Sequence, residues 1–112
     1  METEIYISRE FGRQFKKLFK KYHSLLDDLN DFKKSILGNP FQGSDLGHGV
    51  RKIRFPISDK GKGKSGGARV ITLNISKSTD TLKVTLLTIY DKSEISNVSD
   101  KYIKSLVEAE KK

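Results

Sequence analysis

Residues 50–57, Val-Arg-Lys-Ile-Arg-Phe-Pro-Ile, decide the fold class because polar and apolar side chains alternate along them. In an extended chain this alternation places Lys52 and Arg54 on one face. The opposite face is apolar and consists of Ile53, Phe55 and Ile57. Pro56 predicts either the end of regular strand pairing or a place at the sheet edge. The stretch therefore predicts a strand that buries one face and presents two cations on the other.

Two further strands are predicted downstream. Residues 68–75 and 81–90 are rich in apolar and β-branched side chains, and the polar residues 76–80 between them suit the turn of an antiparallel hairpin. A short first strand is expected at residues 5–7. Residues 41–49 contain three glycines and are interpreted as a connecting loop.

Helical periodicity predicts three helices. Ser8 is expected to cap the first, whose apolar stripe consists of Phe11, Phe15, Leu18, Phe19 and Tyr22. Ser24 is expected to begin a second helix that Gly38-Asn39-Pro40 ends, and Ser99 a short last helix. The order strand, two helices, three strands, helix predicts one α+β domain over residues 1–112, with the helices on one face of a mainly antiparallel sheet.

The positive charge is concentrated in two segments. The formal net charge is +8; residues 11–21 hold five Lys and Arg and no acid, and residues 51–69 hold seven Lys and Arg against one Asp. A basic cluster of this kind attracts a polyanion, most commonly nucleic acid. For residues 11–21, a solvated helix face that keeps the protein soluble is the alternative.

Composition favours a soluble cytoplasmic protein. The sequence has no cysteine, no apolar run long enough to span a bilayer, and neither a basic nor an apolar start typical of a secretory signal. We therefore expect a cytoplasmic location and no membrane partner.

The glycine-rich segment 58–67 superficially matches two nucleotide-binding motifs. Residues 61–66 satisfy G-x-G-x-x-G, but that motif needs a helix after it, and a strand is predicted here. Gly63-Lys64-Ser65 also matches the end of a Walker A motif, but Ser58 occupies the position of the first glycine that this motif requires. We instead expect Lys52, Arg54 and Arg69 to surround one phosphodiester, with a solvated charged face as the alternative.

Three blocks of the sequence resemble HigB-type members of the RelE toxin superfamily. They are residues 49–54, Gly-Val-Arg-Lys-Ile-Arg; residues 60–71, Lys-Gly-Lys-Gly-Lys-Ser-Gly-Gly-Ala-Arg-Val-Ile; and residues 86–94, Leu-Leu-Thr-Ile-Tyr-Asp-Lys-Ser-Glu. The blocks occur in family order, and the similarity covers nearly the whole chain. The sequence departs at residues 72–74, where relatives commonly place aromatic residues, so the resemblance assigns this strand no base-stacking role.

The resemblance implies a RelE-like fold in which an N-terminal strand and a helical hairpin pack on the sheet and a helix ends the chain. It also implies a toxin of a type II toxin–antitoxin system, a monomer on its own, that cleaves messenger RNA on the ribosome without a metal or other cofactor. The implied partner is a cognate antitoxin, either a small helix-turn-helix protein encoded nearby or one with an acidic segment that covers the basic surface.

The candidate catalytic residues are Lys52, Arg54, Arg69, Tyr90 and Lys92, and the candidate RNA-binding residues are Arg51, Lys60, Lys62 and Lys64. Repulsion from neighbouring cations favours loss of the Lys52 proton, which suits a general base, while Arg69 and Arg54 would hold the phosphate. Tyr90 or Lys92 would lie near a base or the leaving oxygen. Tyr90 is equally interpretable as an ordinary strand aromatic, and His48 is an alternative proton carrier.

Two other functional classes are open at this point. The fold is shared with ParE-type toxins, which bind DNA gyrase rather than cut RNA, and a non-catalytic RNA-binding module would also be basic. Fold alone does not separate these classes. The cations Lys52, Arg54 and Arg69 favour the nuclease.

Overall fold

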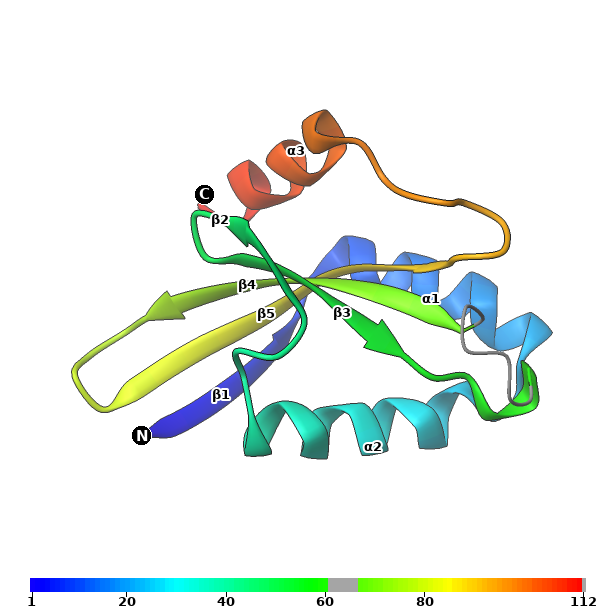
Figure 1. The fold of residues 1–112 in the computed structure, drawn as a ribbon, viewed down its shortest axis with the longest axis horizontal. Coiled ribbons are helices and arrows are strands. Elements are labelled where there is room, and N and C mark those ends of the chain that lie inside the picture. Colours follow the sequence, from blue (N-terminus) through cyan, green and yellow to red (C-terminus); the bar gives the residue numbers. More distant parts are fainter. Residues whose placement is uncertain (61–66, 112) are drawn as a thin grey trace.

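A computed structural model describes residues 1–60 and 67–111, which form a five-stranded sheet and three α-helices (Figure 1). The elements are β1 (Glu2–Ile7), α1 (Arg9–Lys21), α2 (Leu25–Gly38), β2 (Ser44–Gly47), β3 (Val50–Phe55), the 3-10 turn η1 (Ser58–Lys60), β4 (Ala68–Ser76), β5 (Thr81–Asp91) and α3 (Asp100–Glu110). The strand order is β1-β5-β4-β3-β2. β1 runs parallel to β5 and the other neighbours are antiparallel, so the predicted α+β class and mainly antiparallel sheet are confirmed.

The main core lies between the sheet and the first two helices. Its helix residues are Phe11, Leu18, Leu25, Leu29, Phe32 and Ile36, and its strand residues include Ile53, Phe55, Val70, Val84, Leu86 and Ile89. The burial of Ile53, Phe55 and Ile57 confirms the alternation predicted for β3. β3 ends at Phe55, so Pro56 lies just beyond the regular pairing.

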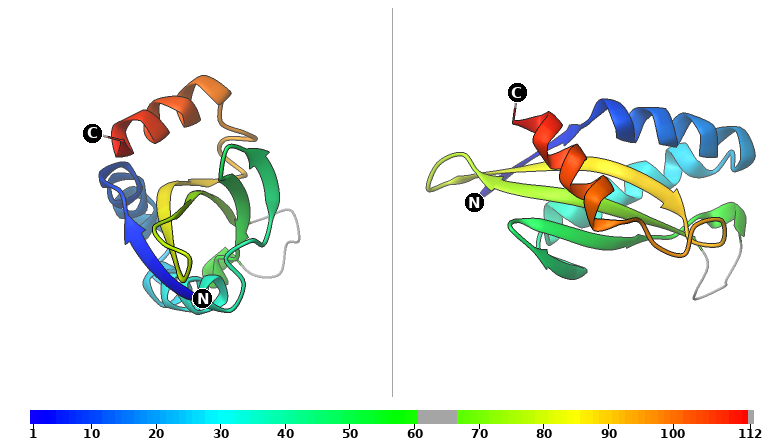
Figure 2. Two further views of the ribbon diagram at one scale, coloured as in Figure 1. Left: turned by 90° about the vertical axis from the view of Figure 1, so that its left-hand side faces the viewer. Right: turned by 90° about the horizontal axis from the view of Figure 1, so that it is seen from above.

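α3 packs on the other face of the sheet. Figure 1 shows α2 and α3 on opposite sides of the sheet, and Figure 2 shows α3 crossing over β4 and β5. A second cluster lies beneath α3 and consists of Val50, Ile71, Leu73, Leu87 and Tyr90, with Val98, Ile103, Leu106 and Val107 packed against it. The expectation that all helices cover one face is therefore wrong for α3, because this end of the second face is also apolar.

The segment between α2 and β3 contains the short strand β2, so its interpretation as a loop was wrong. Ser44 pairs with Lys52 and Asp45 with Arg51 at the sheet edge. The residues of β2 are Ser-Asp-Leu-Gly, which show no polar–apolar alternation. Its strand conformation comes from pairing with β3 rather than from its own sequence.

All three helices begin directly after the predicted serines, but only two of these serines form a capping hydrogen bond. The hydroxyls of Ser8 and Ser99 each accept a hydrogen bond from a backbone N–H three residues on. Ser24 makes no such bond. Its hydroxyl donates to Asp28 Oδ2 at 2.8 Å and accepts from the Asp59 backbone N–H at 3.0 Å, so it joins α2 to η1 instead.

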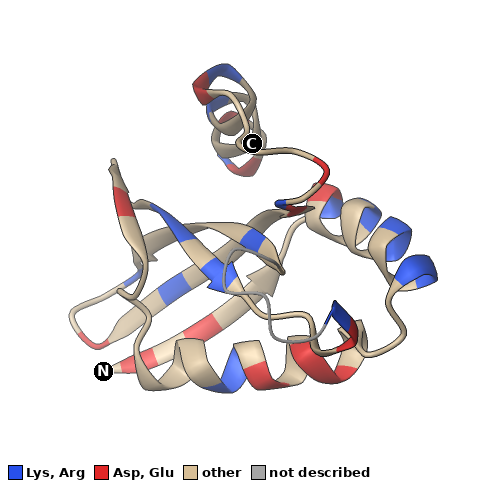
Figure 3. Cartoon of the chain, turned by 45° about the vertical axis from the view of Figure 1, so that its right-hand side comes forward, with Lys and Arg blue, Asp and Glu red and all other residues tan. Residues whose placement is uncertain are grey.

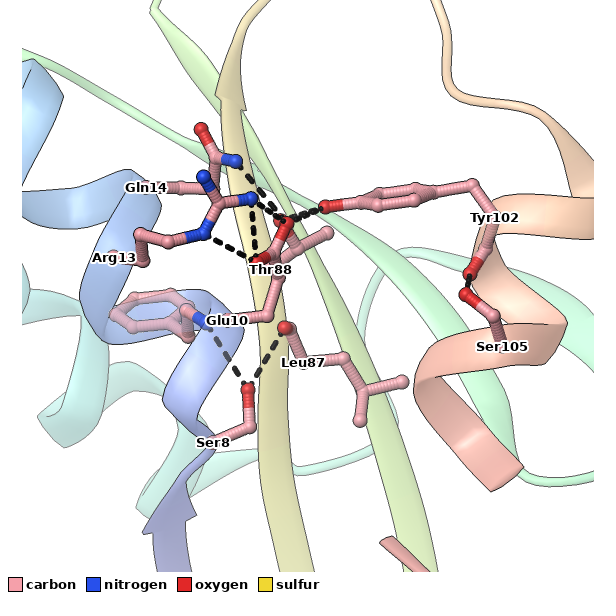
Figure 4. A network of polar contacts seen from close by, with 9 residues as sticks. Ser8, Glu10, Arg13, Gln14, Leu87, Thr88, Tyr102 and Ser105 are labelled. Atoms are coloured by element: carbon pink, nitrogen blue, oxygen red, sulfur yellow. Dashed lines mark hydrogen bonds and ion pairs between the residues drawn. The ribbon is translucent and has the colours of Figure 1, made fainter. Parts of the chain in front are cut away.

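A β-bulge in β5 connects the sheet to α1. Ile71 pairs with Thr88 but Thr72 pairs with Leu86, so Leu87 is the extra residue. The Leu87 carbonyl accepts a hydrogen bond from the Ser8 hydroxyl at 2.9 Å (Figure 4). The bulge shifts the alternation of β5 by one residue, so Leu86 and Ile89 both belong to the main core, and Leu87 and Tyr90 both belong to the cluster beneath α3.

Tyr102 anchors α3 to the rest of the molecule (Figure 4). Its hydroxyl donates to Glu10 Oε2 at 2.5 Å and lies 3.0 Å from Thr88 Oγ1. Burial and the bond to the Glu10 carboxylate raise the pKa of Tyr102, so it is a protonated donor at neutral pH. These bonds tie α3 to both α1 and β5.

The helices in the described ranges are all too short or too polar to span a bilayer.

Candidate functional site

Four of the five candidate catalytic residues share one face of the sheet. Arg54 on β3 pairs with Arg69 on β4, and Arg69 pairs with Tyr90 on β5. Residues directly opposite each other in antiparallel strands point to the same side. Lys52 lies two residues before Arg54, so it faces that side as well. We call these four residues, three cations and Tyr90, the cationic row. The row lies on the face of the sheet opposite α1 and α2.

A hollow of about 340 Å³ lies beside the three cations of the row, and Tyr90 does not line it. Its lining consists of Lys52, Ile53, Arg54 and Arg69 from the strands and Gln42, Gly43 and Ser44 from the connection into β2. Three of these side chains are cationic, and none of the described acidic residues lines the hollow. Its volume falls in the range of small-ligand sites. The hollow therefore suits an anion such as a phosphate group.

Arg69 is the most enclosed charge of the row. It is only 9% exposed, and its guanidinium Nη1 donates to the Ala68 carbonyl at 3.1 Å. Among the described residues, no carboxylate lies within ion-pair distance of Arg69 or Arg54. A buried charge without a counter-ion is costly, and a like charge directly opposite adds to that cost. An anion between the two guanidinium groups offsets both costs.

Gly67 allows β4 to begin close to the end of β3. Its φ is 78°, and a side-chain Cβ there would lie 2.9 Å from the Phe55 carbonyl oxygen. Only glycine fits this conformation and this approach without strain. The residue thus helps to place Arg69 opposite Arg54.

Asn97 links two members of the cationic row and was missed in the sequence. Its side-chain oxygen accepts long hydrogen bonds from Lys52 Nζ at 3.5 Å and from the Tyr90 hydroxyl at 3.4 Å. The same oxygen accepts from the Val98 backbone N–H at 3.0 Å. Asn97 belongs to the polar stretch before α3, where no periodicity or motif marks a functional residue.

The Tyr90 hydroxyl is a proton donor at neutral pH. Tyr90 is 5% exposed, and this burial raises the pKa of its phenol, whereas the charge of Arg69 acts in the opposite direction. Burial has the larger effect. The group therefore suits donation to a developing negative charge.

Arg51 does not join the cationic row, because it points to the opposite side of β3 from its neighbours. Its Nε donates to the Gln42 carbonyl at 2.9 Å and its Nη2 to the Gly43 carbonyl at 3.1 Å. Asp45 lies 3.8 Å from the guanidinium. Arg51 thereby holds the chain segment that forms one wall of the hollow.

Lys60 is held by its own polar cluster. Its ammonium donates to Asp91 Oδ1 at 2.8 Å and to Ser93 Oγ at 2.9 Å, and it lies 5.7 Å from the centre of the Tyr22 ring. Burial alone would raise the pKa of Asp91, but hydrogen bonds from Lys60, Ser93 and Tyr22 outweigh it and lower the pKa to about 2. Lys60 is thus already paired with a buried carboxylate, and it does not line the hollow.

The remaining candidates lie apart from the hollow or outside the described residues. Lys92 follows β5, where its backbone N–H donates to the Gly67 carbonyl at 3.2 Å. His48 is exposed, with a φ of 56°, in the turn between β2 and β3. Neither residue lines the hollow. Lys62 and Lys64 lie outside the described residues.

The cationic row provides groups for phosphate chemistry. Two guanidinium groups can share the charge of a phosphodiester, Lys52 can exchange a proton, and Tyr90 can donate one. Within residues 1–60 and 67–111, no three His, Asp or Glu side chains gather as ligands for a metal ion. No protein-family model matches this chain.

Proposed function

We propose that this protein is a RelE/HigB-type toxin that cleaves messenger RNA on the ribosome. The observation that supports the proposal most is Arg69, a nearly buried charge without a carboxylate partner in the described part of the chain. It lies opposite Arg54, in a hollow that also takes in Lys52. The three sequence blocks that resemble the family include these same residues.

In the proposed reaction, the scissile phosphodiester lies between Arg54 and Arg69. Lys52 in its neutral form takes the proton of the 2′-hydroxyl, and the 2′-oxygen attacks phosphorus. The bidentate guanidinium of Arg69 stabilises the charge that develops on the phosphate oxygens. The bond to the 5′-oxygen breaks, and Tyr90 donates the proton that this oxygen gains. The products are a 2′,3′-cyclic phosphate and a 5′-hydroxyl end.

The ribosome has a physical role in this proposal. Attack by the 2′-oxygen requires it to be in line with the bond that breaks, and a flexible RNA rarely adopts that arrangement. A ribosome holds the codon in a fixed conformation, so the cationic row meets a substrate that is already oriented. Cleavage of free RNA should accordingly be slow even where binding occurs.

The proposal is tested by mapping messenger RNA 5′ ends after induced expression, with parallel reactions in vitro with and without ribosomes. We expect growth arrest, and new 5′ ends that appear within translated RNA only when ribosomes are present. An antitoxin encoded nearby should suppress both effects. Healthy growth at confirmed expression would contradict the proposal. Inhibition of a topoisomerase with intact messenger RNA would favour the ParE-like alternative, and binding without cleavage would favour an RNA-binding module.

A further inference from the structure

A ladder of aromatic rings runs along α1 and into the turn that follows it, from the core to the surface. Phe11, Phe15, Phe19 and His23 follow one another at a spacing of four residues, with successive ring centroids 5.9, 6.3 and 6.1 Å apart. Phe11 is buried, whereas Phe19 is 38% exposed and His23 is exposed. Phe19, a member of the apolar stripe predicted for this helix, therefore lies partly outside the core. Phe19 stacks on Phe15, whereas the His23 ring is tilted by 49° to Phe19, so the ladder ends in two non-parallel rings at the solvent.

Lysines of α1 lie within three residues of Phe19 in the sequence. Lys16, Lys17 and Lys20 are exposed, and none forms an ion pair with a carboxylate of the described residues. By contrast, Arg13 and Lys21 on the same helix pair with Glu10 and Glu94. Figure 3 shows the Lys and Arg positions along α1, in blue, apart from those on the strands of the cationic row.

The spacing of these lysines is unfavourable for the isolated helix. Lys16 and Lys20 are one turn apart on the same side, where like charges repel and weaken a helix. Lys16 also precedes Phe19 by three residues, so it neighbours the exposed ring. An anionic ligand that also offers a flat aromatic group would remove the repulsion and cover the ring.

We propose that the solvent end of α1 is a second RNA-binding site, which takes an unpaired nucleotide. The base stacks on the Phe19 and His23 end of the ladder, and Lys16 and Lys20 bind the adjoining phosphates. Because every base has a flat π-face, the site tolerates different sequences. It adds affinity for RNA and takes no part in cleavage, so it goes beyond the proposed function.

Unpaired RNA fits this surface better than a purely anionic partner. An acidic peptide or an RNA duplex would neutralise the lysines, but neither offers an unstacked base to cover Phe19. The ring and the lysines together therefore point to single-stranded RNA. Binding that depends on charge alone would indicate one of the other partners.

The experiment measures binding of the full chain to a labelled, unstructured RNA of about 12 nucleotides, a length in the usual range for single-strand sites, without ribosomes. Phe19→Leu should weaken binding about fivefold or more, because it keeps an apolar side chain but removes the stacking face. Phe19→Trp should restore it. Phe41→Leu is the matched control, since Phe41 is 50% exposed but lies outside α1, and it should change little.

The lysines are tested with the same RNA. Lys16→Gln with Lys20→Gln should weaken binding and lower the slope of log K against log salt by about 1.4, because two phosphate contacts are lost. Lys33→Gln with Lys34→Gln on α2 removes the same charge and should lower the slope less. All substituted side chains except Lys33 are exposed, so the Tm of each variant should stay near that of the unsubstituted protein.

The proposal is overturned if Phe19→Leu binds RNA as Phe41→Leu does, or if the two lysine pairs have equal effects. Equal sensitivity of a matched RNA duplex to Phe19→Leu would also overturn it. Cleavage on ribosomes is mapped separately for the same variants. If the unsubstituted protein does not cleave messenger RNA, the proposed function fails but the second RNA-binding site can still be confirmed. If it cleaves messenger RNA and the α1 variants bind RNA normally, only the second site is refuted.

Discussion

Arg54 and Arg69 lie directly opposite each other on β3 and β4, and neither has a carboxylate partner among the described residues. Opposed like charges weaken a strand pair, and the burial of Arg69 adds a desolvation cost. Arg54, in contrast, is exposed to solvent. The pair therefore combines a fixed, enclosed guanidinium with an accessible one, an arrangement suited to capture and then orient a phosphate.

Because Arg54 is exposed, its substitution should affect RNA binding more than stability. Arg54→Gln removes one phosphate contact and relieves repulsion of Arg69, so RNA affinity should fall, with a salt slope lower by about 0.7. The free energy of unfolding should stay within about 0.5 kcal/mol or rise. Salt-dependent binding and urea unfolding on one preparation check both. Lys34→Gln, an exposed change on α2, is the control; an equal change in slope for the two variants would argue against a phosphate contact at Arg54.

Asn97 should act as a positioning residue for Lys52 and Tyr90. Asn97→Ala removes the acceptor shared by the ammonium and the hydroxyl, so we expect single-turnover cleavage on ribosomes to slow about tenfold with nearly unchanged affinity. Asn97→Asp places a carboxylate beside Lys52, which favours the charged lysine and should move the rate optimum to higher pH. Ser96→Ala, in the same exposed segment, is the control. Wild-type rates in both Asn97 variants would exclude this role.

The ion pair between Asp91 and Lys60 should make stability depend on acid pH. Folding lowers the pKa of Asp91 from its ordinary 3.8 to about 2, so folding favours the carboxylate. This contribution, about 2 kcal/mol, is fully present above pH of about 4 and is lost as the pH falls toward about 2. Asp91→Asn should therefore destabilise the protein near neutral pH and reduce the loss of stability in acid.

Urea unfolding at several pH values between about 2 and 7 measures this dependence. Asp31→Asn removes an exposed carboxylate from α2 and should leave the pH dependence nearly as it is. If Asp91→Asn retains the full acid-induced loss, the ion pair does not contribute as described.

Much of the fold follows from local patterns in the sequence. The alternation in residues 50–57 places Ile53 in the core, and Ser8 and Ser99 cap helices as predicted. The short strand β2 and the bulge at Leu87 arise from pairing with a neighbouring strand, and the periodicity of a segment carries no record of such pairing. The position of α3 likewise depends on an apolar cluster assembled from three strands.

The sequence predicts the candidate site only as far as the alternation of side chains along a strand determines it. Because side chains alternate along a strand, Lys52 and Arg54 lie on one face and Arg51 on the opposite face. There the Arg51 guanidinium donates hydrogen bonds to the Gln42 and Gly43 carbonyls. The register that brings Arg69 beside Arg54 needs the three-dimensional structure. Asn97 reaches the row from a loop, and a loop residue has no periodicity to mark it.

The most direct test of the account is single-turnover cleavage on programmed ribosomes by Arg69→Ala and Arg69→Lys, with thermal unfolding of both variants. If Arg69 stabilises charge that develops only in the transition state, Arg69→Ala should lower the cleavage rate about a hundredfold or more while ribosome affinity stays nearly intact. Arg69→Lys should recover only part of the rate, because an ammonium lacks the bidentate fork. An unchanged rate per folded molecule, with only a lower Tm, would contradict the account, and full recovery by lysine would show that charge alone suffices.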